Sequence, residues 1–295
     1  MLYYIIYIVC TSFIFSNESS FNTLWGRCTL VNKSSLSSNH IINTIEQEVQ
    51  KMYEVYGPIP QNNFSILIDS DQAIFSRHPH WQWSLGITYK NPDKIILKDP
   101  ALSKISWGKF KQVISHELNH IMLNRTQHYH TIPRWFKEGL AMKIADEISM
   151  YHKLKIASNT NNPILFNLTD YSRFKNMNKQ EFHFAYALSS ASILLLEKIY
   201  GDHTSDRIVL NLIAGFTFES SFYNVTGFEI ENFYQRFYNE IKKNFFWFKF
   251  INLPKNLFAI MPLILIIGFY IKSYRNKKII EQWKLEEELE DTETY

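Results

Sequence analysis

Cysteine is almost missing from this chain of 295 residues, which contains only two. Cys10 lies in an apolar stretch at the N-terminus, so Cys28 stands alone in the rest of the chain. One cysteine cannot form an internal disulfide, and it cannot supply the thiolate cluster of a cysteine-based metal site. A disulfide scaffold is therefore excluded, and any metal site must use other ligands.

The chain also lacks a strong charge of one sign, with a net charge of +3. The region between its apolar ends has no Lys/Arg cluster typical of nucleic-acid binding, so no nucleic-acid partner is expected. It has no internal repeat and no Gly/Ser linker. An apolar fraction of 46% with 16% aromatic residues excludes general disorder. These features predict one folded domain, at residues 19–244.

An almost uninterrupted apolar run extends from Leu2 to Phe15 and is followed by polar residues. It is too short to span a bilayer comfortably, but it has the length of a signal-peptide core. No Lys or Arg precedes it, and a buried strand or helix is the alternative. We interpret residues 1–18 as a signal peptide or N-terminal hydrophobic segment, and we expect export of the domain.

Residues 257–271 carry no charge and are slightly short for a bilayer of roughly 30 Å. The aromatic stretch that starts at residue 245 can extend this run at the membrane interface, and a basic cluster follows it. The basic residues are Lys272, Arg275, Lys277 and Lys278. We predict an aromatic belt and transmembrane helix at 245–271 that contacts the bilayer through 257–271. The tail, 272–295, would be cytoplasmic and the domain outside the cytoplasm; a core helix of a soluble domain is the alternative.

Within the domain, periodicity predicts a helix over Ser37–Tyr56 that stops at Gly57. Phe64–Ile68 has the composition of a buried strand, and residues 84–89 and 94–98 are typical of a hairpin. The remainder is mostly helical in pattern. Strands first and helices later predict an α+β domain.

The most informative pattern is His-Glu-x-x-His at residues 116–120, inside a predicted helix from about 106 to 124. His116 and His120 are one turn apart on one face, so both imidazoles can reach a single metal ion. Glu117 lies beside that face, where it can act as a base on a bound water. Glu138 follows on a second predicted helix, which begins near Pro133, and can supply the third ligand.

Two histidines and one carboxylate leave the fourth position of a tetrahedral Zn²⁺ ion open, as in catalytic sites. We therefore predict one zinc ion bound by His116, His120 and Glu138, with Glu117 as the catalytic base. The alternative is that these histidines are ordinary core or solvated residues and Glu138 a surface carboxylate. Two further pairs, His78 with His80 and His128 with His130, are interpreted as solvated loop histidines.

The segment Pro133-Arg-Trp135-Phe-Lys-Glu138-Gly139-Leu-Ala141 after His116-Glu-Leu-Asn-His120 resembles the gluzincin zinc metallopeptidases, specifically the peptidase MA-like families. Their pattern is H-E-L-x-H followed by P-x-W-x-x-E-G-x-A. Residues 186–201 and 222–241 resemble their later helices. The resemblance implies a zincin-like fold with a small twisted sheet over the active-site helix, followed by a helical lobe. It also implies hydrolysis of protein or peptide substrates.

An oxyanion that develops during such a reaction needs a donor besides the metal. Tyr186 matches the tyrosine that leads a helix in the family, although a core or surface role is equally open, and His183 is the runner-up. Where thermolysin-like enzymes place an Asp four residues after the glutamate ligand, this chain has Met142, so the partner of the histidines is unidentified. No Gly-x-Met-x-Asn motif precedes the helix, which leaves endopeptidase activity as the default.

The rival hypothesis is a catalytically silent zincin-fold module that binds a partner or has a structural role at the membrane. The intact Glu117 argues against it, because a silent site has no use for a base. The substrate and oligomeric state cannot be predicted from the sequence.

Overall fold

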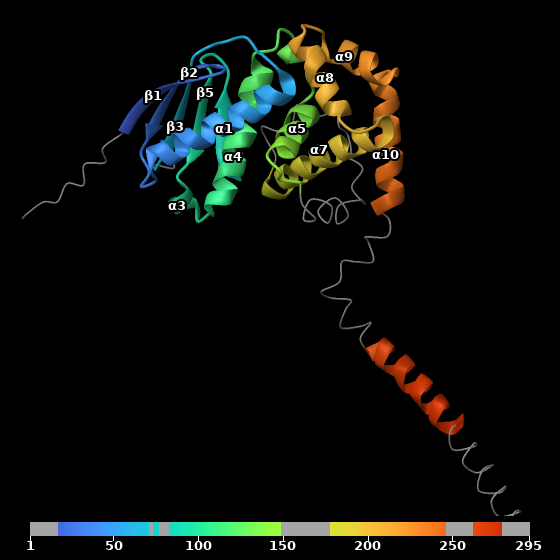
Figure 1. Ribbon diagram of the computed structural model, residues 1–295. Coiled ribbons are helices and arrows are strands. Elements are labelled where there is room, and N and C mark those ends of the chain that lie inside the picture. The colour runs from blue at the N-terminus through green and yellow to red at the C-terminus, as the bar shows by residue number, and fades with distance from the viewer. Residues whose placement is uncertain (1–16, 71–72, 77–82, 149–177, 246–261, 279–295) are drawn as a thin grey trace, which may run out of the picture. The chain divides into compact units, whose positions relative to one another are not determined.

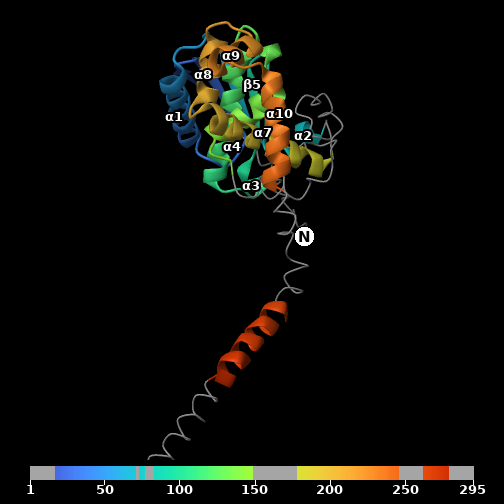
Figure 2. The same ribbon diagram turned by 90° about the vertical axis from the view of Figure 1, so that its right-hand side faces the viewer.

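A computed structural model describes residues 17–70, 73–76, 83–148, 178–245 and 262–278 (Figures 1 and 2). The chain divides into two compact units, residues 1–243 and residues 244–295. The first contains the domain that the sequence predicts. Residues 1–16, most of the proposed signal segment, lie outside the described part.

A five-stranded mixed sheet forms one side of the first unit, with the strand order β1-β2-β3-β5-β4. Its strands are β1 (Asn17–Thr23), β2 (Gly26–Asn32), β3 (Phe64–Asp69), β4 (Gly86–Tyr89) and β5 (Lys94–Lys98). β1 and β2 are antiparallel, as are β4 and β5, whereas β3 runs parallel to both β2 and β5. The predicted strand at 64–68 and the predicted hairpin are confirmed, and β4 forms one edge of the described sheet, opposite β1.

The first two strands were not predicted. β1 begins at Asn17, within the residues assigned to the N-terminal segment, and its mostly polar sequence hides it. β2 does show a period of two, because Cys28, Leu30 and Asn32 are buried and the residues between them are not. The sequence does not display this alternation, because the half-buried Val31 is apolar and the buried Asn32 is polar.

Two long helices, α1 (Ser38–Tyr56) and α4 (Trp107–Asn124), lie along one face of the sheet (Figure 1). Both were predicted, and α1 stops at Gly57, whose φ of 72° suits glycine. The side chain of Ser106 caps α4 by accepting a hydrogen bond from the Lys109 backbone N–H at 3.2 Å. The short helices α2 (Ala73–Ser76) and α3 (Pro100–Ser103) lie in the connections.

The helical lobe follows the sheet, as expected for the predicted α+β class. After the 3₁₀ turn η2 (Tyr129–Thr131) come α5 (Arg134–Ile144), α7 (Lys179–Tyr200), α8 (Thr204–Ile213), α9 (Phe218–Thr226) and α10 (Ile230–Phe245). Pro133 is the N-cap of α5, one residue earlier than the predicted first turn. Gly201 and Gly227 end α7 and α9, so the predicted segment 222–241 spans two helices.

Close packing of α5 against α7 and α10 fixes the position of α5. Gly139 lies so near α7 that a Cβ there would collide with the backbone carbonyl of Ser189. Trp135 is fully buried and stacks on Phe233 of α10, with ring centroids 5.4 Å apart. Glu138 is therefore carried by a helix whose depth and rotation are both set by the core.

The second unit contains one described helix, at residues 262–278. Among the described residues, none of the helices combines the length and the apolar character needed to cross a bilayer. Residues 246–261 of the predicted aromatic belt and transmembrane helix, and residues 279–295 of the predicted tail, lie outside the described part.

Candidate metal centre

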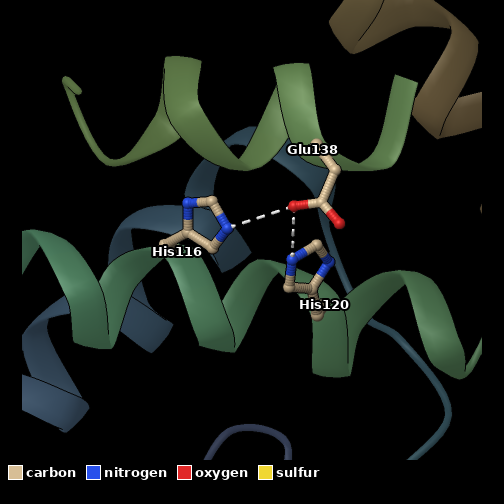
Figure 3. Close-up of side chains that lie close together, drawn as sticks. All are labelled: His116, His120 and Glu138. Carbon is tan, nitrogen blue, oxygen red and sulfur yellow. Dashed lines mark ion pairs between the residues drawn. The ribbon is translucent and has the colours of Figure 1, made fainter. Parts of the chain in front are cut away.

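Three side chains from α4 and α5 converge on one point (Figure 3). His116 and His120 project from successive turns of α4, and Glu138 faces them from α5. Glu138 Oε2 lies 3.5 Å from Nε2 of His116 and 3.5 Å from Nε2 of His120. One potential ligand atom from each residue lies within 4.8 Å of the others. The structure thus brings together the three residues that the sequence singled out.

The geometry and chemistry of this group fit a zinc ion. Two ligands about 2.1 Å from an ion at the tetrahedral angle are about 3.4 Å apart, which is close to both distances from Glu138. Glu138 Oε2 is buried and has no hydrogen-bond partner among the described residues. A buried carboxylate oxygen without a donor is costly unless a cation meets it. Within the described residues, no other group of three His, Cys, Asp or Glu side chains has such an arrangement.

Glu147 is the partner of His116 that the sequence did not reveal. Its Oε2 lies 2.9 Å from His116 Nδ1, and its Oε1 accepts a hydrogen bond of 2.8 Å from Lys109 Nζ. A carboxylate on Nδ1 fixes the tautomer that leaves Nε2 available to a metal. Met142, four residues after Glu138 at the position where thermolysin-like enzymes have an Asp, is buried in the core.

A turn at the end of α5 delivers Glu147 to this place. Asp146 adopts a left-handed conformation with φ of 52°, its N–H donates to Lys143 O, and the Glu147 N–H donates to Met142 O at 2.9 Å. These are the bonds of a Schellman cap, in which glycine usually occupies the left-handed position. Gln112 Nε2 of α4 donates to the Asp146 carbonyl and ties the turn to the zinc helix. Because an Asp occupies the position where glycine is usual, this turn is not recognisable from the residue pattern.

Strand β4 holds the predicted base. The Thr88 hydroxyl donates to Glu117 Oε2 at 2.6 Å, and Gly86 lies so close that a Cβ there would be 2.6 Å from Glu117 Cγ. Burial raises the pKa of Glu117, and the opposing effects of His116, His120 and Thr88 leave it above its ordinary value. A carboxylate with a raised pKa is better matched to proton transfer near neutral pH.

Tyr186 of α7 also reaches the centre. Its ring stacks on that of His116, with centroids 6.2 Å apart and planes at 26°. Burial and the negative charge of Glu138 raise the pKa of Tyr186 well above its usual value. Its phenol is therefore protonated at neutral pH and can act as a donor. His183 lines a separate cavity of about 210 Å³ on the Glu147 side of His116.

Two of the three candidate ligands, His116 and Glu138, have strongly shifted pKa values in the metal-free protein. Burial lowers the pKa of His116, but interactions with Glu138 and Glu147 outweigh it and raise the pKa to about 10. Burial raises the pKa of Glu138, yet the positive charge of His120 and the contact with His116 hold it well below its usual range. A proton on His116 thus balances part of the carboxylate charge, and a metal ion would replace it.

A cavity of about 350 Å³ opens onto the centre between β4 and the lobe. Glu117, His120, Glu138 and Tyr186 line it together with β4. His128 and His130, with ring centroids 6.1 Å apart, belong to the connector before α5 and are not part of the centre. His78 and His80 lie outside the described residues.

Several solved structures of zinc peptidases are similar to part of the chain. A two-domain M1 zinc metallopeptidase variant bound to L-arginine aligns with 75% of this chain and 51% of its own length, at 10% identity and a TM-score of 0.43. An aminopeptidase N family protein from Idiomarina loihiensis aligns with 74% of this chain and 46% of its own length, at 12% identity and a TM-score of 0.46. An M1 zinc metallopeptidase from Deinococcus radiodurans aligns with 72% of this chain and 47% of its own length, at 12% identity and a TM-score of 0.40. The chain spans about half the length of these structures, and no curated protein matches it.

The family comparison covers the part of the chain that builds the centre. Residues 44–243, about two thirds of the chain, match the Peptidase MA superfamily. This range contains α4, α5 and α7, and with them every residue described at the centre. The predicted relationship to the peptidase MA-like gluzincins is confirmed, and the chain belongs to the Peptidase MA superfamily.

Proposed function

We propose that the protein is a zinc-dependent metallopeptidase that hydrolyses peptide bonds. The observation that carries this proposal is the placement of Glu117 beside the His116, His120 and Glu138 group, with its carboxylate held by Thr88. When bound, zinc would act as a Lewis acid that lowers the pKa of water towards 7. The three ligands leave one tetrahedral position for that water.

Glu117 would act as the general base and acid. Its carboxylate takes the proton of the attacking water and then delivers it to the leaving amine. The raised pKa of Glu117 makes its carboxylate a stronger base and so favours removal of the proton from water, and the Thr88 hydrogen bond keeps one carboxylate oxygen fixed while the proton moves. A binding module without turnover, the alternative, would not require these contacts.

Two further residues would support the reaction. The protonated phenol of Tyr186 can donate a hydrogen bond to the oxyanion that develops on the substrate carbonyl. Glu147 would act through His116, by holding the imidazole in the orientation that a metal requires.

The cavity favours an extended peptide as substrate. It runs along β4, an edge strand of the described sheet, and an extended chain can add to such an edge through main-chain hydrogen bonds. We propose endopeptidase activity, because the sequence before α4 contains no Gly-x-Met-x-Asn motif of the kind that recognises a free N-terminus.

We also propose that residues 257–271 attach the protein to a membrane, with the domain outside the cytoplasm and the basic tail inside. The uncharged run and the basic residues after it support this topology. Proteolysis of intact cells should remove the domain and spare the tail. Loss of a C-terminal tag under the same treatment would reverse the topology.

The catalytic proposal is tested with the full chain, loaded with zinc, on an unfolded general protein substrate. We expect cleavage by the wild type and none by Glu117→Gln, with zinc content equal in both. Glu46→Gln, which changes an exposed glutamate on α1, is the matched control and should cleave normally. Zinc binding without cleavage of any substrate would favour the silent module.

A further inference from the structure

Two lysines from distant parts of the sequence meet at one tyrosine in the wall of the cavity. Lys90 follows β4, Lys137 belongs to α5, and each Nζ lies 4.1 Å from the centroid of the Tyr129 ring. Tyr129 itself comes from η2. All three side chains line the 350 Å³ cavity that contains Glu117 and Glu138.

This arrangement concentrates positive charge without neutralising it. Contact with the ring holds both ammonium groups in place, but a ring quadrupole does not cancel a charge. Among the described residues, neither Lys90 nor Lys137 has a carboxylate within ion-pair distance, and Arg134 lines the same cavity. The acidic residues of the lining are Glu117 and Glu138, which already face Thr88 and the two histidines. No carboxylate of the described residues meets these two charges, which leaves them able to bind an anion.

The location of the lysines relates them to the bond that would be cut. Thr88 contacts the base Glu117, and Lys90 comes two residues further along the same chain segment, on the order of 7 Å away. Lys137 immediately precedes the ligand Glu138. An extended peptide beside β4 would therefore pass the lysines within one or two residues of its reacting carbonyl.

We propose that Lys90 and Lys137, ordered by Tyr129, form a subsite for a substrate carboxylate next to the scissile bond. The inference rests on the proposed peptidase function and names its substrate class, peptides with a negative charge close to the cleavage point. An Asp or Glu side chain and the C-terminal carboxylate offer the same chemistry. Charge-assisted hydrogen bonds from two ammonium groups suit either source.

Matched peptides test this with the zinc-loaded full chain. One series places Glu or Gln at each position within two residues of a common cleavage site, and another ends in a free or an amidated C-terminus. For one position, or for the C-terminus, we expect the charged peptide to have a kcat/KM roughly 10- to 100-fold higher than that of its uncharged counterpart. A preference in the first series identifies a side chain, and a preference in the second identifies the terminus. Equal rates in both series would overturn the inference.

Variants assign the preference to these lysines. In Lys90→Met/Lys137→Met the ratio of charged to neutral cleavage should fall towards one, and Lys90→Arg should retain it. Lys198→Met is the control. Its side chain is 69% exposed, its contact with the Glu240 carboxylate is long at 4.0 Å, and it does not line the cavity. A ratio that persists in the double variant would contradict the assignment, even if all rates decrease.

A binding measurement separates this inference from the proposed function. Zinc-loaded Glu117→Gln is titrated with fluorescent forms of the same peptides, and the dissociation constants of each pair are compared. Tighter binding of the charged peptide without cleavage by the wild type would refute the peptidase and keep the subsite. Equal binding in every pair would refute the subsite, whether or not the wild type cleaves.

Discussion

Glu147 Oε2 lies 2.9 Å from His116 Nδ1, so a residue outside the His-Glu-x-x-His motif holds one of the three candidate metal ligands. Lys109 holds the other oxygen of Glu147, so the carboxylate is fixed from both sides. Lys109 and His116 both belong to α4, whereas Glu147 follows α5. The contact therefore also joins the two helices that carry the ligands.

Replacing this carboxylate should weaken zinc binding without removing any ligand. For Glu147→Gln we expect a loss of roughly 10- to 100-fold in zinc affinity, because His116 loses the partner that sets its tautomer. Competition with a chromogenic chelator measures the affinity, and Glu46→Gln serves as the control. Unchanged affinity would show that α4 alone orients the imidazole.

Gly86 should be intolerant of even one added methyl group. In Gly86→Ala the new Cβ would lie 2.6 Å from Glu117 Cγ and from Glu117 Oε1, so the base must move. Peptide hydrolysis should fall by roughly 100-fold or more, since misplacement by about 1 Å costs that much, while zinc remains bound. In the control Gly108→Ala, the nearest atom to the new Cβ is Ser106 Oγ at 4.0 Å, and activity should be normal.

The hydroxyl of Thr88 should influence the pH dependence of hydrolysis. Its hydrogen bond lowers the pKa of Glu117, so Thr88→Val should raise that pKa further. Glu117 would then become protonated at higher pH, and the acidic limb of the kcat/KM profile would move towards neutrality. Thr29→Val, on β2, should leave the limb in place. If the acidic limb does not move in Thr88→Val, the limb reports the titration of a group other than Glu117.

The stability of the metal-free protein should decline at alkaline pH. The pKa of His116 is raised from 6.5 to about 10, so its stabilising effect is complete below 6.5 and is lost as the pH approaches 10. The pKa of Glu147 is lowered from 4.5 to about 2, so its contribution is complete above 4.5 and is lost on acidification towards 2. These two groups thus favour maximum stability between about 4.5 and 6.5.

Thermal unfolding of chelator-treated protein between pH 6 and pH 10 measures this effect. The unfolding midpoint of the wild type should fall from pH 6 to pH 10. The share of this decrease that comes from deprotonation of His116 should be missing in His116→Asn. Zinc-loaded wild type should also lack this share of the decrease, because the metal replaces the proton on His116. Identical profiles for metal-free wild type and His116→Asn would contradict the assigned pKa.

The sequence predicted that His116, His120 and Glu138 would come together, because helical spacing is a local property. His116 and His120 are one turn apart in any helix, and a motif on the next helix marks Glu138. The His-Glu-x-x-His motif marks Glu117 as the proposed base. Local patterns also predicted α1 from its helical periodicity and β3 from its short apolar run, and the turn residues between 89 and 94 indicated the hairpin.

Other features depend on how distant segments meet. Glu147 reaches His116 only because Asp146 takes a left-handed conformation, which Asp adopts less readily than Gly. Lys90, Tyr129 and Lys137 are brought together by a turn after β4, a 3₁₀ turn and a helix, and no pattern in the sequence connects them. Strand β1 is polar and exposed on alternate residues, so its pairing with β2 defines it more than its own sequence does.

Zinc content measured by mass spectrometry on five purified full-chain proteins tests the central claim most directly. The proteins are the wild type, His116→Ala, His120→Ala, Glu138→Ala and Glu117→Gln. We predict one zinc per chain in the wild type and in Glu117→Gln, and little zinc in the three alanine variants. Full zinc content in the alanine variants, or equal loss in all four substitutions, would contradict the proposed division between ligands and base.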